Sequence, residues 1–255
     1  MIDVRKVTKI YKGRIHALRN ITFSIKQGEF VYVIGASGAG KSTLLKLLYR
    51  EEIQTFGSIK IGNTFASQIT HKQLYLLRRQ LGVVMQSDLF LSNRTVFENI
   101  AVCVEAVSGA NNSKVAMRTN EALDVVGMLD KSGRKINELS IGQQKRVAIA
   151  RAIVNHPSIV LADEPTANLD AKAALEIMKL FFKINSMGTT VIMATHDSTM
   201  VNTVRERVLE LSKGELIRDE QDGGIPNTPI IKTCISGNKV LIISMNFRYE
   251  EHRVV

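Results

Sequence analysis

Cysteine is scarce in this sequence, which argues against stabilisation of the fold by disulfide bonds or by a cysteine-bound metal. Cys103 and Cys234 are the only cysteines, they lie far apart, and neither belongs to a spacing typical of metal ligands. Neither a disulfide framework nor a cysteine-rich zinc site is therefore expected. We expect both residues to be reduced thiols of a cytoplasmic protein.

Long apolar runs are also missing. The longest candidates, "VYVIG" and "VLIIS", have the length of strands, whereas a membrane-spanning helix needs roughly 18 apolar residues. The opening residues, "MIDVRKVTKIY", alternate like a strand and lack the apolar core of a signal peptide. We therefore expect a protein that does not itself span a membrane.

Tryptophan is absent and aromatic residues make up only 5% of the chain, yet 45% of the residues are hydrophobic. With 255 residues, the chain can build one large α/β domain, or a domain with a subdomain. The net charge of +10 suits nucleic acid, an anionic membrane surface or a polyphosphate ligand. No block of Lys and Arg is long enough to resemble a nucleic-acid arm, so we expect no specific nucleic-acid partner.

The order of the predicted strands and helices indicates a parallel sheet with two additions. Residues 2–10 and 19–26 alternate like paired strands around the turn "YKGR", and "FGSIKIGNT" has the pattern of another short strand pair. The apolar runs in "EFVYVIG", "LGVVMQ", "SIVLADEP" and "TTVIMATHD" are typical of buried parallel strands, and helix-forming segments follow them. From about residue 88 to residue 151 the pattern turns helical, which predicts an inserted helical subdomain.

The last part of the chain differs from the rest. After a predicted hairpin around "SKGE", the segment "QDGGIPNTP" has the composition of a linker, and "IIKTCI" and "KVLIISM" can pair across "SGN". We therefore divide the chain into one domain over residues 1–220 and a C-terminal extension over residues 221–255, which is either a small β-hairpin or disordered.

A phosphate-binding loop is the clearest chemical motif. The segment "GASGAGKST", from Gly35 to Thr43, fits G-x-x-x-x-G-K-[ST] after a predicted strand and before a predicted helix. Its glycines allow backbone N–H groups to wrap phosphates, Lys41 can reach the β- and γ-phosphates, and the Ser42 hydroxyl can ligate Mg²⁺. The alternative, a chance glycine-rich turn, is hard to reconcile with that context.

Polar residues follow three other buried strands and are predicted to meet at the same sheet edge. Asp163 and Glu164 end "IVLADE", Gln86 ends "LGVVMQ", and His196 ends "VIMATH". Asp163 is placed to hold Mg²⁺ through water, and Glu164 to polarise an attacking water. Gln86 can offer an amide oxygen to Mg²⁺, and His196 can contact the γ-phosphate. Each residue alone could equally be structural, as a helix cap or a packed strand end.

A second helix start, "LSIGQQKRVAIARA", also favours an anion. Ser140 can cap this helix, Gly142 permits close approach to the backbone, and the free N–H groups at a helix start attract negative charge. The residues that follow, Gln144, Lys145 and Arg146, fit the solvated face of the helix.

Six motifs in this order resemble the nucleotide-binding domain of ABC ATPases. They are "GASGAGKST", Gln86, "LSIGQ", "IVLADEP", "ANLD" and "ATHD", and the resemblance covers residues 1 to about 219. It implies a P-loop NTPase core of the ABC type, with an N-terminal antiparallel β subdomain and a helical subdomain. It also implies ATP and Mg²⁺ as ligands and a homodimer in which "LSIGQ" of one subunit closes over the ATP of the other.

The resemblance also implies roles for individual residues. Tyr11 would stack on adenine, and Asp170 would couple the two sites across the dimer interface. Ile141 is a departure, because the family usually has Gly there. The residues expected to act in catalysis are Lys41, Glu164 and His196, and those expected to hold Mg²⁺ are Ser42, Gln86 and Asp163. The residues expected to contact the nucleotide are Tyr11, Gly35, Ala36, Ser37, Gly38, Ala39, Gly40, Lys41, Ser42, Thr43, Gln86, Ser140, Gly142, Gln143, Asp163 and Asp170.

Finer features are similar to the cell-division branch of this family. They are Ala39, "YREE" after the first predicted helix and "LRRQ" before the Gln86 strand. Members of that branch pair with an FtsX-like integral membrane protein at the cytoplasmic face of the membrane and act indirectly on extracytoplasmic peptidoglycan hydrolases. Leu89, Phe90 and Phe97 are candidates for the groove that receives the membrane partner.

Two other functions remain open at this point. The ATPase subunit of a lipoprotein-release or macrolide-type exporter would share the chemistry of all six motifs. A soluble ABC ATPase acting on nucleic acid fits less well, because only about a hundred residues without sustained heptads separate the phosphate loop from "LSIGQ".

Overall fold

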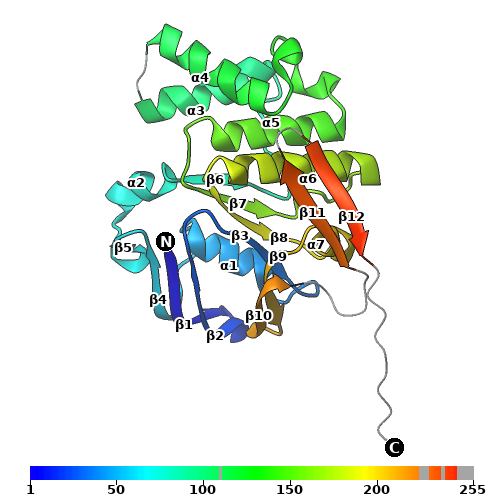
Figure 1. Ribbon diagram of the computed structural model, residues 1–255. Helices are drawn as coiled ribbons and strands as arrows, with labels where there is room; N and C mark the ends of the chain where they lie inside the picture. Colours follow the sequence, from blue (N-terminus) through cyan, green and yellow to red (C-terminus); the bar gives the residue numbers. More distant parts are fainter. Residues whose placement is uncertain (109–110, 224–229, 237–238, 246–255) are drawn as a thin grey trace, which may run out of the picture.

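The computed structural model describes residues 1–108, 111–223, 230–236 and 239–245 (Figure 1). The strands are β1 (Ile2–Tyr11), β2 (Ile15–Ile25), β3 (Phe30–Ile34), β4 (Phe56–Ile61), β5 (Thr64–Phe65), β6 (Leu81–Val84), β7 (Ile159–Asp163), β8 (Thr190–Ala194), β9 (Glu206–Ser212), β10 (Glu215–Gly223), β11 (Ile230–Ser236) and β12 (Lys239–Met245). The α-helices are α1 (Lys41–Leu48), α2 (Leu74–Arg78), α3 (Val96–Ser108), α4 (Asn112–Val125), α5 (Ile141–Ile153), α6 (Ala171–Ser186) and α7 (Ser198–Thr203). Short 3-10 helices are η1 (Ala66–Gln68), η2 (His71–Gln73), η3 (Leu129–Lys131) and η4 (Ile136–Glu138).

A six-stranded sheet with the order β10-β9-β3-β8-β7-β6 lies at the centre of the molecule. Neighbouring strands from β9 to β6 run parallel, and β10 is the antiparallel edge. Successive side chains of a strand point to opposite faces, so the continuous apolar runs serve two cores at once. In β3, for example, Phe30, Tyr32 and Ile34 belong to one core, whereas Val31 and Val33 belong to the other.

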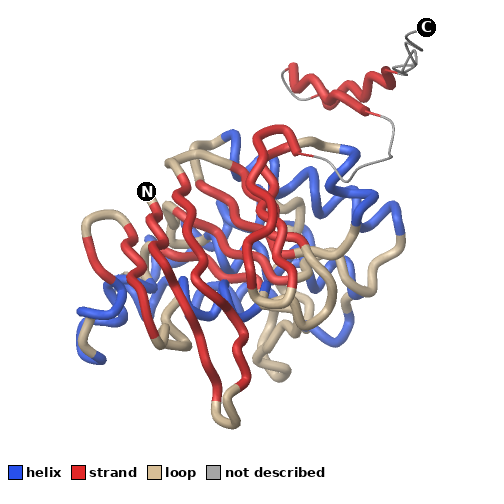
Figure 2. Tube along the Cα trace, turned by 90° about the horizontal axis from the view of Figure 1, so that it is seen from below, coloured by secondary structure: helices blue, strands red, loops and turns tan. Residues whose placement is uncertain are grey.

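A four-stranded antiparallel sheet, ordered β2-β1-β4-β5, forms the N-terminal β layer. The strands β1 and β2 form a long hairpin, as predicted, although β2 begins several residues earlier than expected (Figure 2). Inward-facing residues of this layer and the apolar side of α1, including Leu44 and Leu48, pack in the second core against the central sheet. The helix α1 is thereby fixed between the two sheets, and its first turn lies at the end of β3.

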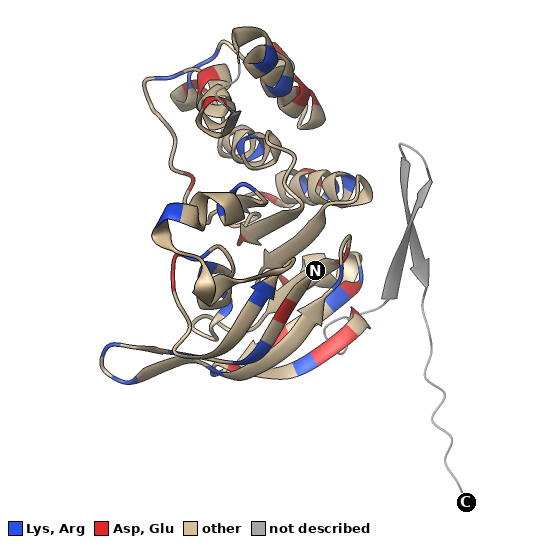
Figure 3. Ribbon diagram, turned by 90° about the vertical axis from the view of Figure 1, so that its left-hand side faces the viewer, with Lys and Arg blue, Asp and Glu red and all other residues tan. Residues whose placement is uncertain are grey.

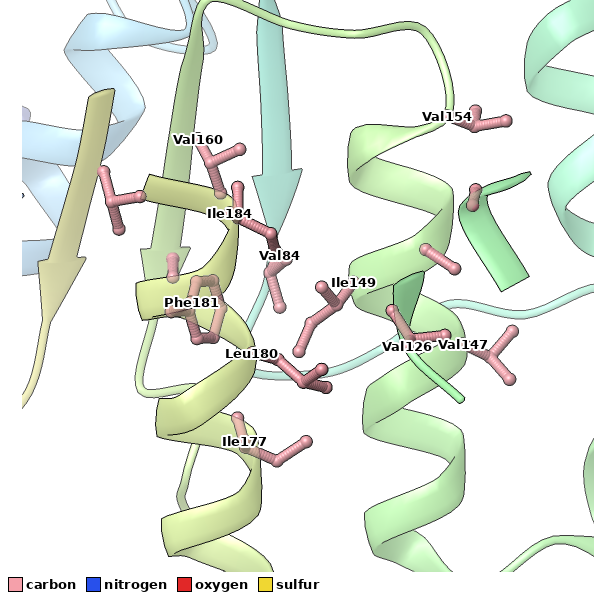
Figure 4. Packing of buried hydrophobic residues seen from close by; sticks show 14 of the residues in the cluster. Val84, Val126, Val147, Ile149, Val154, Val160, Ile177, Leu180, Phe181 and Ile184 are labelled. Atoms are coloured by element: carbon pink, nitrogen blue, oxygen red, sulfur yellow. The ribbon is translucent and has the colours of Figure 1, made fainter. Parts of the chain in front are cut away.

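The helical subdomain consists of α3, α4 and α5, and α5 packs beside α6 (Figure 4). Ile177, Phe181 and Ile184 follow the spacing of one helix face, and Figure 4 shows them directed toward the core. Burying one such large apolar side chain stabilises a fold by roughly 1.5–3 kcal/mol. This packing holds α5 beside the sheet that carries the phosphate loop.

The region beyond residue 223 contains β11 and β12, which pair in antiparallel register from Ile230–Met245 to Ser236–Lys239. Residues 221–223, the first of the predicted C-terminal extension, belong to β10 instead, and residues 224–229, 237–238 and 246–255 lie outside the described residues. Among the helices that are described, none combines the length and apolar character needed to cross a bilayer. Basic and acidic residues are interspersed along the strands and helices in the ribbon of Figure 3.

Candidate active site

The phosphate-loop segment, residues 35–43, joins β3 to α1 as the motif predicts. Gly35, Gly38 and Gly40 all have positive φ angles, of 147°, 78° and 110°. A Cβ atom on Gly35 would lie 2.3 Å from the Leu211 carbonyl oxygen, and one on Gly40 would lie 2.6 Å from the Ala17 carbonyl oxygen. A Cβ on Gly38 would meet nothing within 4 Å. Space therefore requires glycine at 35 and 40, whereas only the backbone angle requires it at 38.

Lys41, the first residue of α1, is only 7% exposed, and the loop itself binds its ammonium group. The Nζ atom donates to the carbonyl oxygen of Gly35 at 2.8 Å and to that of Ala36 at 3.4 Å. It also lies 3.7 Å from Oε1 of Glu164. The cation is thus held inside the loop, in reach of any phosphate that the loop takes up.

Asp163 is the last residue of β7, and it lies beside Ser42, which follows Lys41. Burial raises the pKa of the Asp163 carboxyl, and the hydrogen bond with Ser42 opposes that rise. Its Oδ1 atom is buried and has no hydrogen-bond partner in the described part of the chain. A hydroxyl and a carboxylate with a spare acceptor match the oxygen donors that Mg²⁺ prefers, so these residues could hold that ion.

Glu164 and His196 are also in contact, although Glu164 follows β7 and His196 follows β8. The Nδ1 atom of His196 lies 2.9 Å from Oε1 of Glu164, and the His196 N–H donates to Oε2 at 3.4 Å. Glu164 itself has a φ of 48°, an unusual angle for a residue with a side chain. Its own N–H donates to the carbonyl oxygen of Ala194 at 2.9 Å. The carboxylate is therefore fixed between Lys41 and His196.

Tyr11 and Gln86 lie outside this hydrogen-bonded cluster. Gln86 follows β6 with an exposed side chain, and Tyr11 ends β1, half-buried, with the Lys9 Nζ atom 4.7 Å from the centroid of its ring. In the described residues no hydrogen bond joins either side chain to Lys41, Asp163 or Glu164. Their roles toward metal and adenine stay predictions.

The second helix start is built as a capping box. The Ser140 hydroxyl accepts from the Gln143 N–H at 3.3 Å, and the Gln143 side chain accepts from the Ser140 N–H at 3.1 Å. Ser140 is exposed, and a Cβ on Gly142 would make only an ordinary 3.5 Å contact with Ala173. The fold of one chain thus confirms Ser140 as a cap but leaves Gly142 without a packing reason.

Asp170 has a local task that the sequence analysis did not assign to it. Its carboxylate accepts from the Ala173 N–H at 2.8 Å and caps α6. Ile141, which replaces the usual glycine of the family, is 59% exposed. The proposed coupling through Asp170 stays a prediction.

One expectation about α5 is wrong. Gln144, Lys145 and Arg146 do not form a solvated face: Lys145 is only 4% exposed and pairs with Asp88 at 2.5 Å. Gln144 donates to the carbonyl oxygens of Ile136 and Leu139, and Arg146 donates to that of Val126. Polar residues at these positions gave no sequence signal for burial, because charged side chains are mostly exposed.

The three candidates for the partner groove are also separated by the structure. Leu89 is 76% exposed, whereas Phe90 and Phe97 pack against the core of the helical side. The sequence could not distinguish them, since all three are large apolar residues in a helical region.

Comparisons with known proteins agree with this arrangement. The ABC transporter family matches residues 18–167. The chain is 46% identical over 223 residues to the cell division ATP-binding protein FtsE of Streptococcus pneumoniae, covering 88% of this chain and 96% of that protein. It is 45% identical over 223 residues to FtsE of Bacillus subtilis, covering 88% and 97%.

A solved structure of an ATP-binding cassette, described as a dimeric post-hydrolysis state bound to ADP and Pi, is also similar. The TM-score is 0.80 with 36% sequence identity, and the match covers 88% of this chain and 100% of that one. The sequence match, the fold and the cluster around Lys41 and Glu164 thus lead to one conclusion: the chain belongs to the ABC transporter family, as an ATPase of the FtsE group.

Proposed function

We propose that this chain is the ATP-hydrolysing subunit of a membrane-associated complex in cell division, the FtsE component of an FtsEX-type pair. The observation that carries the proposal is the convergence of Lys41, Glu164 and His196 at one sheet edge, together with the exposed Ser140 cap elsewhere on the same chain. One chain therefore presents two halves of a site that do not touch each other.

The two halves are joined when two copies meet head to tail. Ser140 of one copy then faces the γ-phosphate held by the loop of the other, and two sites form at a symmetric interface. A hydroxyl has one proton and two lone pairs. Ser140 can thus keep accepting from Gln143 while donating its proton to a phosphate oxygen. Gly142 leaves space for that approach.

Hydrolysis follows from the residues around the loop. Lys41 exchanges its carbonyl partners for phosphate oxygens, and Ser42, Asp163 and Gln86 are the residues that would hold Mg²⁺. The ion, when bound, neutralises charge between the phosphates. Glu164 orients the attacking water, and His196, hydrogen-bonded to Glu164, contacts the γ-phosphate. Loss of that phosphate removes the charges that hold the two copies together.

The membrane partner is an FtsX-like integral membrane protein, which places this chain peripherally on the cytoplasmic face of a bacterial membrane. A groove of about 810 Å³ between α2, α3 and α5 is lined by Tyr75, Arg78, Arg79 and Arg151, among others. A partner segment with acidic and apolar side chains fits this lining. Closure and opening of the dimer would then be passed through that partner to peptidoglycan hydrolases outside the membrane.

The variant Glu164→Gln tests the proposed cycle. It retains the shape of the side chain but cannot orient water as a carboxylate does. We expect it to bind ATP, to hydrolyse it at least a hundredfold more slowly than wild type, and to shift toward a dimer in size-exclusion chromatography with Mg-ATP. Hydrolysis at the wild-type rate would remove Glu164 from its role.

The proposed complex needs a separate experiment. Co-expression with an FtsX-like membrane protein should give a complex that purifies together in detergent. Arg78→Glu with Arg79→Glu should weaken that complex without changing ATP binding by the isolated chain. Copurification with a substrate-translocating permease in place of the FtsX-like protein would contradict the cell-division assignment.

A further inference from the structure

The segment that follows Gln86 is fastened to α5 by a buried ion pair. Nζ of Lys145 lies 2.5 Å from Oδ2 of Asp88 and donates to the Met85 carbonyl oxygen at 3.3 Å. The Lys145 and Asp88 side chains are only 5% and 11% exposed. Met85 and Asp88 flank Gln86 in sequence, so Lys145 holds the chain on both sides of that residue.

A second attachment lies about two turns further along α5. Arg151 donates to the carbonyl oxygen of Leu89, and its guanidinium lies 4.9 Å from the centroid of the Phe90 ring. The hydrogen bonds of Gln144 and Arg146, by contrast, go to residues 126–139 of the helical subdomain, and Arg146 also pairs with Glu176 of α6. In the described part of the chain, Lys145 and Arg151 are thus the α5 side chains that make polar contacts with residues 85–90.

Lys145 lies close to the tip of α5, so its ion pair with Asp88 links that tip to the Gln86 segment. Lys145 lies five residues after Ser140, which at 1.5 Å per residue is about 8 Å from the helix start. Asp88 lies two residues after Gln86. One contact therefore connects the segment of Gln86, which is proposed to hold Mg²⁺ at the chain's own nucleotide, with the helix whose tip is proposed to cover the nucleotide of the second copy.

Because the ion pair between Lys145 and Asp88 is buried, it is costly to separate. Two opposite charges that are shielded from water attract strongly, and separating them leaves each one desolvated and unpaired. The Oδ1 atom of Asp88 is already buried without a hydrogen-bond partner in the described part of the chain, so Lys145 supplies the main compensation for this carboxylate. Neither residue can shift alone at low cost.

We propose that Asp88 and Lys145 are positioning residues that make the Gln86 segment and α5 move as one body during ATP-driven closure. The inference rests on the proposed dimer cycle. ATP bound at the loop draws Gln86 toward it, the ion pair transmits that displacement to α5, and the helix tip swings toward the second copy. The pair itself touches no nucleotide.

The test compares the double variant Asp88→Asn/Lys145→Met with wild type. Removing both charges leaves no unpaired buried ion, so a purely structural pair predicts normal folding together with normal hydrolysis. We expect the double variant to melt within a few degrees of wild type and to bind ATP with unchanged affinity, but with kcat lowered about tenfold. In a Glu164→Gln background it should also lose most of the ATP-dependent dimer.

Glu176→Gln is the matched control. It removes the partner of Arg146, the residue next to Lys145, and so breaks an ion pair between α5 and α6 instead of the one between α5 and the Gln86 segment. We expect its kcat and dimer fraction to stay within twofold of wild type. A double variant that hydrolyses ATP like wild type would overturn the proposal. Absence of ATPase activity in wild type would refute the proposed function instead.

A distance measurement tests the same proposal without altering the pair. Spin labels at the exposed positions Leu89 and Met117, in a background with Cys103 and Cys234 replaced by Ala, report whether the Gln86 segment and the helical subdomain move together. We expect one narrow distance distribution that ATP does not shift. A shift of several ångströms on ATP addition would show independent motion and overturn the proposal.

Discussion

The glycines of the phosphate loop permit a graded test of how the loop binds its ligand. Gly38 has a φ of 78° and open space around its Cα, whereas Gly40 has a φ of 110° and a carbonyl oxygen where a Cβ would stand. Alanine at a left-handed position costs roughly 1–2 kcal/mol. Because the empty loop can relax away from this conformation, the cost falls mainly on nucleotide binding. Since about 1.4 kcal/mol is a factor of ten, Gly38→Ala should weaken ATP binding about tenfold.

Gly40→Ala adds a steric term to the backbone term. Its Cβ would stand 2.6 Å from the Ala17 carbonyl oxygen and 2.7 Å from Cδ2 of Leu18, and such overpacking costs roughly 1–3 kcal/mol more. The two terms together predict an affinity loss of about a hundredfold or more. Gly38→Asn, by contrast, should lose less than Gly38→Ala, because asparagine tolerates left-handed angles better than other residues with side chains.

The assay is isothermal titration of each purified variant with Mg-ATP, with circular dichroism melting as a check that the fold is retained. The expected order of affinity is wild type, Gly38→Asn, Gly38→Ala, Gly40→Ala. If Gly38→Ala and Gly40→Ala bound ATP equally well, the distinction between angle and space would be refuted.

Three further predictions concern the cation, the helix tip and the core. Lys41→Ala should weaken ATP binding about a hundredfold, because charge-assisted hydrogen bonds to phosphate are lost; unchanged affinity in the same titration would contradict the role of Lys41. Ser140→Arg should leave ATP binding by the single chain intact but abolish hydrolysis, and preserved turnover in a phosphate-release assay would exclude a shared site. Tyr32 is fully buried and its hydroxyl has no hydrogen-bond partner in the described residues. Tyr32→Phe should therefore stabilise the fold by roughly 1 kcal/mol and raise Tm by about 2–4 °C; a lower Tm in calorimetry would show that the hydroxyl is satisfied.

Much of the fold could be predicted because the position of a residue in a strand or helix determines its burial, and burial in turn favours apolar residues. Strands such as β3 and β8 lie between two cores, so every residue is buried, nearly all are apolar, and the run stands out. The residues at the ends of these strands were predicted to share one edge, and Asp163, Glu164 and His196 do so. Chain order alone suffices for that prediction, because parallel strands point the same way.

Contacts between distant segments could not be predicted in this way. Lys145 looks like a surface residue on α5, and only the three-dimensional position of Asp88, more than fifty residues earlier, makes it a buried one. The same holds for Asp170, whose motif suggested an interface role while its backbone context makes it a cap. A single sequence does not show whether a polar side chain is exposed or makes a buried contact, or whether it caps a helix or lies at an interface.

Ser140, in the capping box at the start of α5, has to meet two requirements: it must cap the helix, and it must accept a phosphate of the second copy as its neighbour. Asparagine and aspartate start helices about as well as serine does, so the stability of α5 leaves the choice at position 140 open. A carboxylate there would face the negative triphosphate of the second copy and repel it, whereas a hydroxyl is neutral and can give up a proton to it. Ser140→Asp would thus separate the requirements of the helix from those of the anion, because the single chain should fold equally well with either residue at position 140.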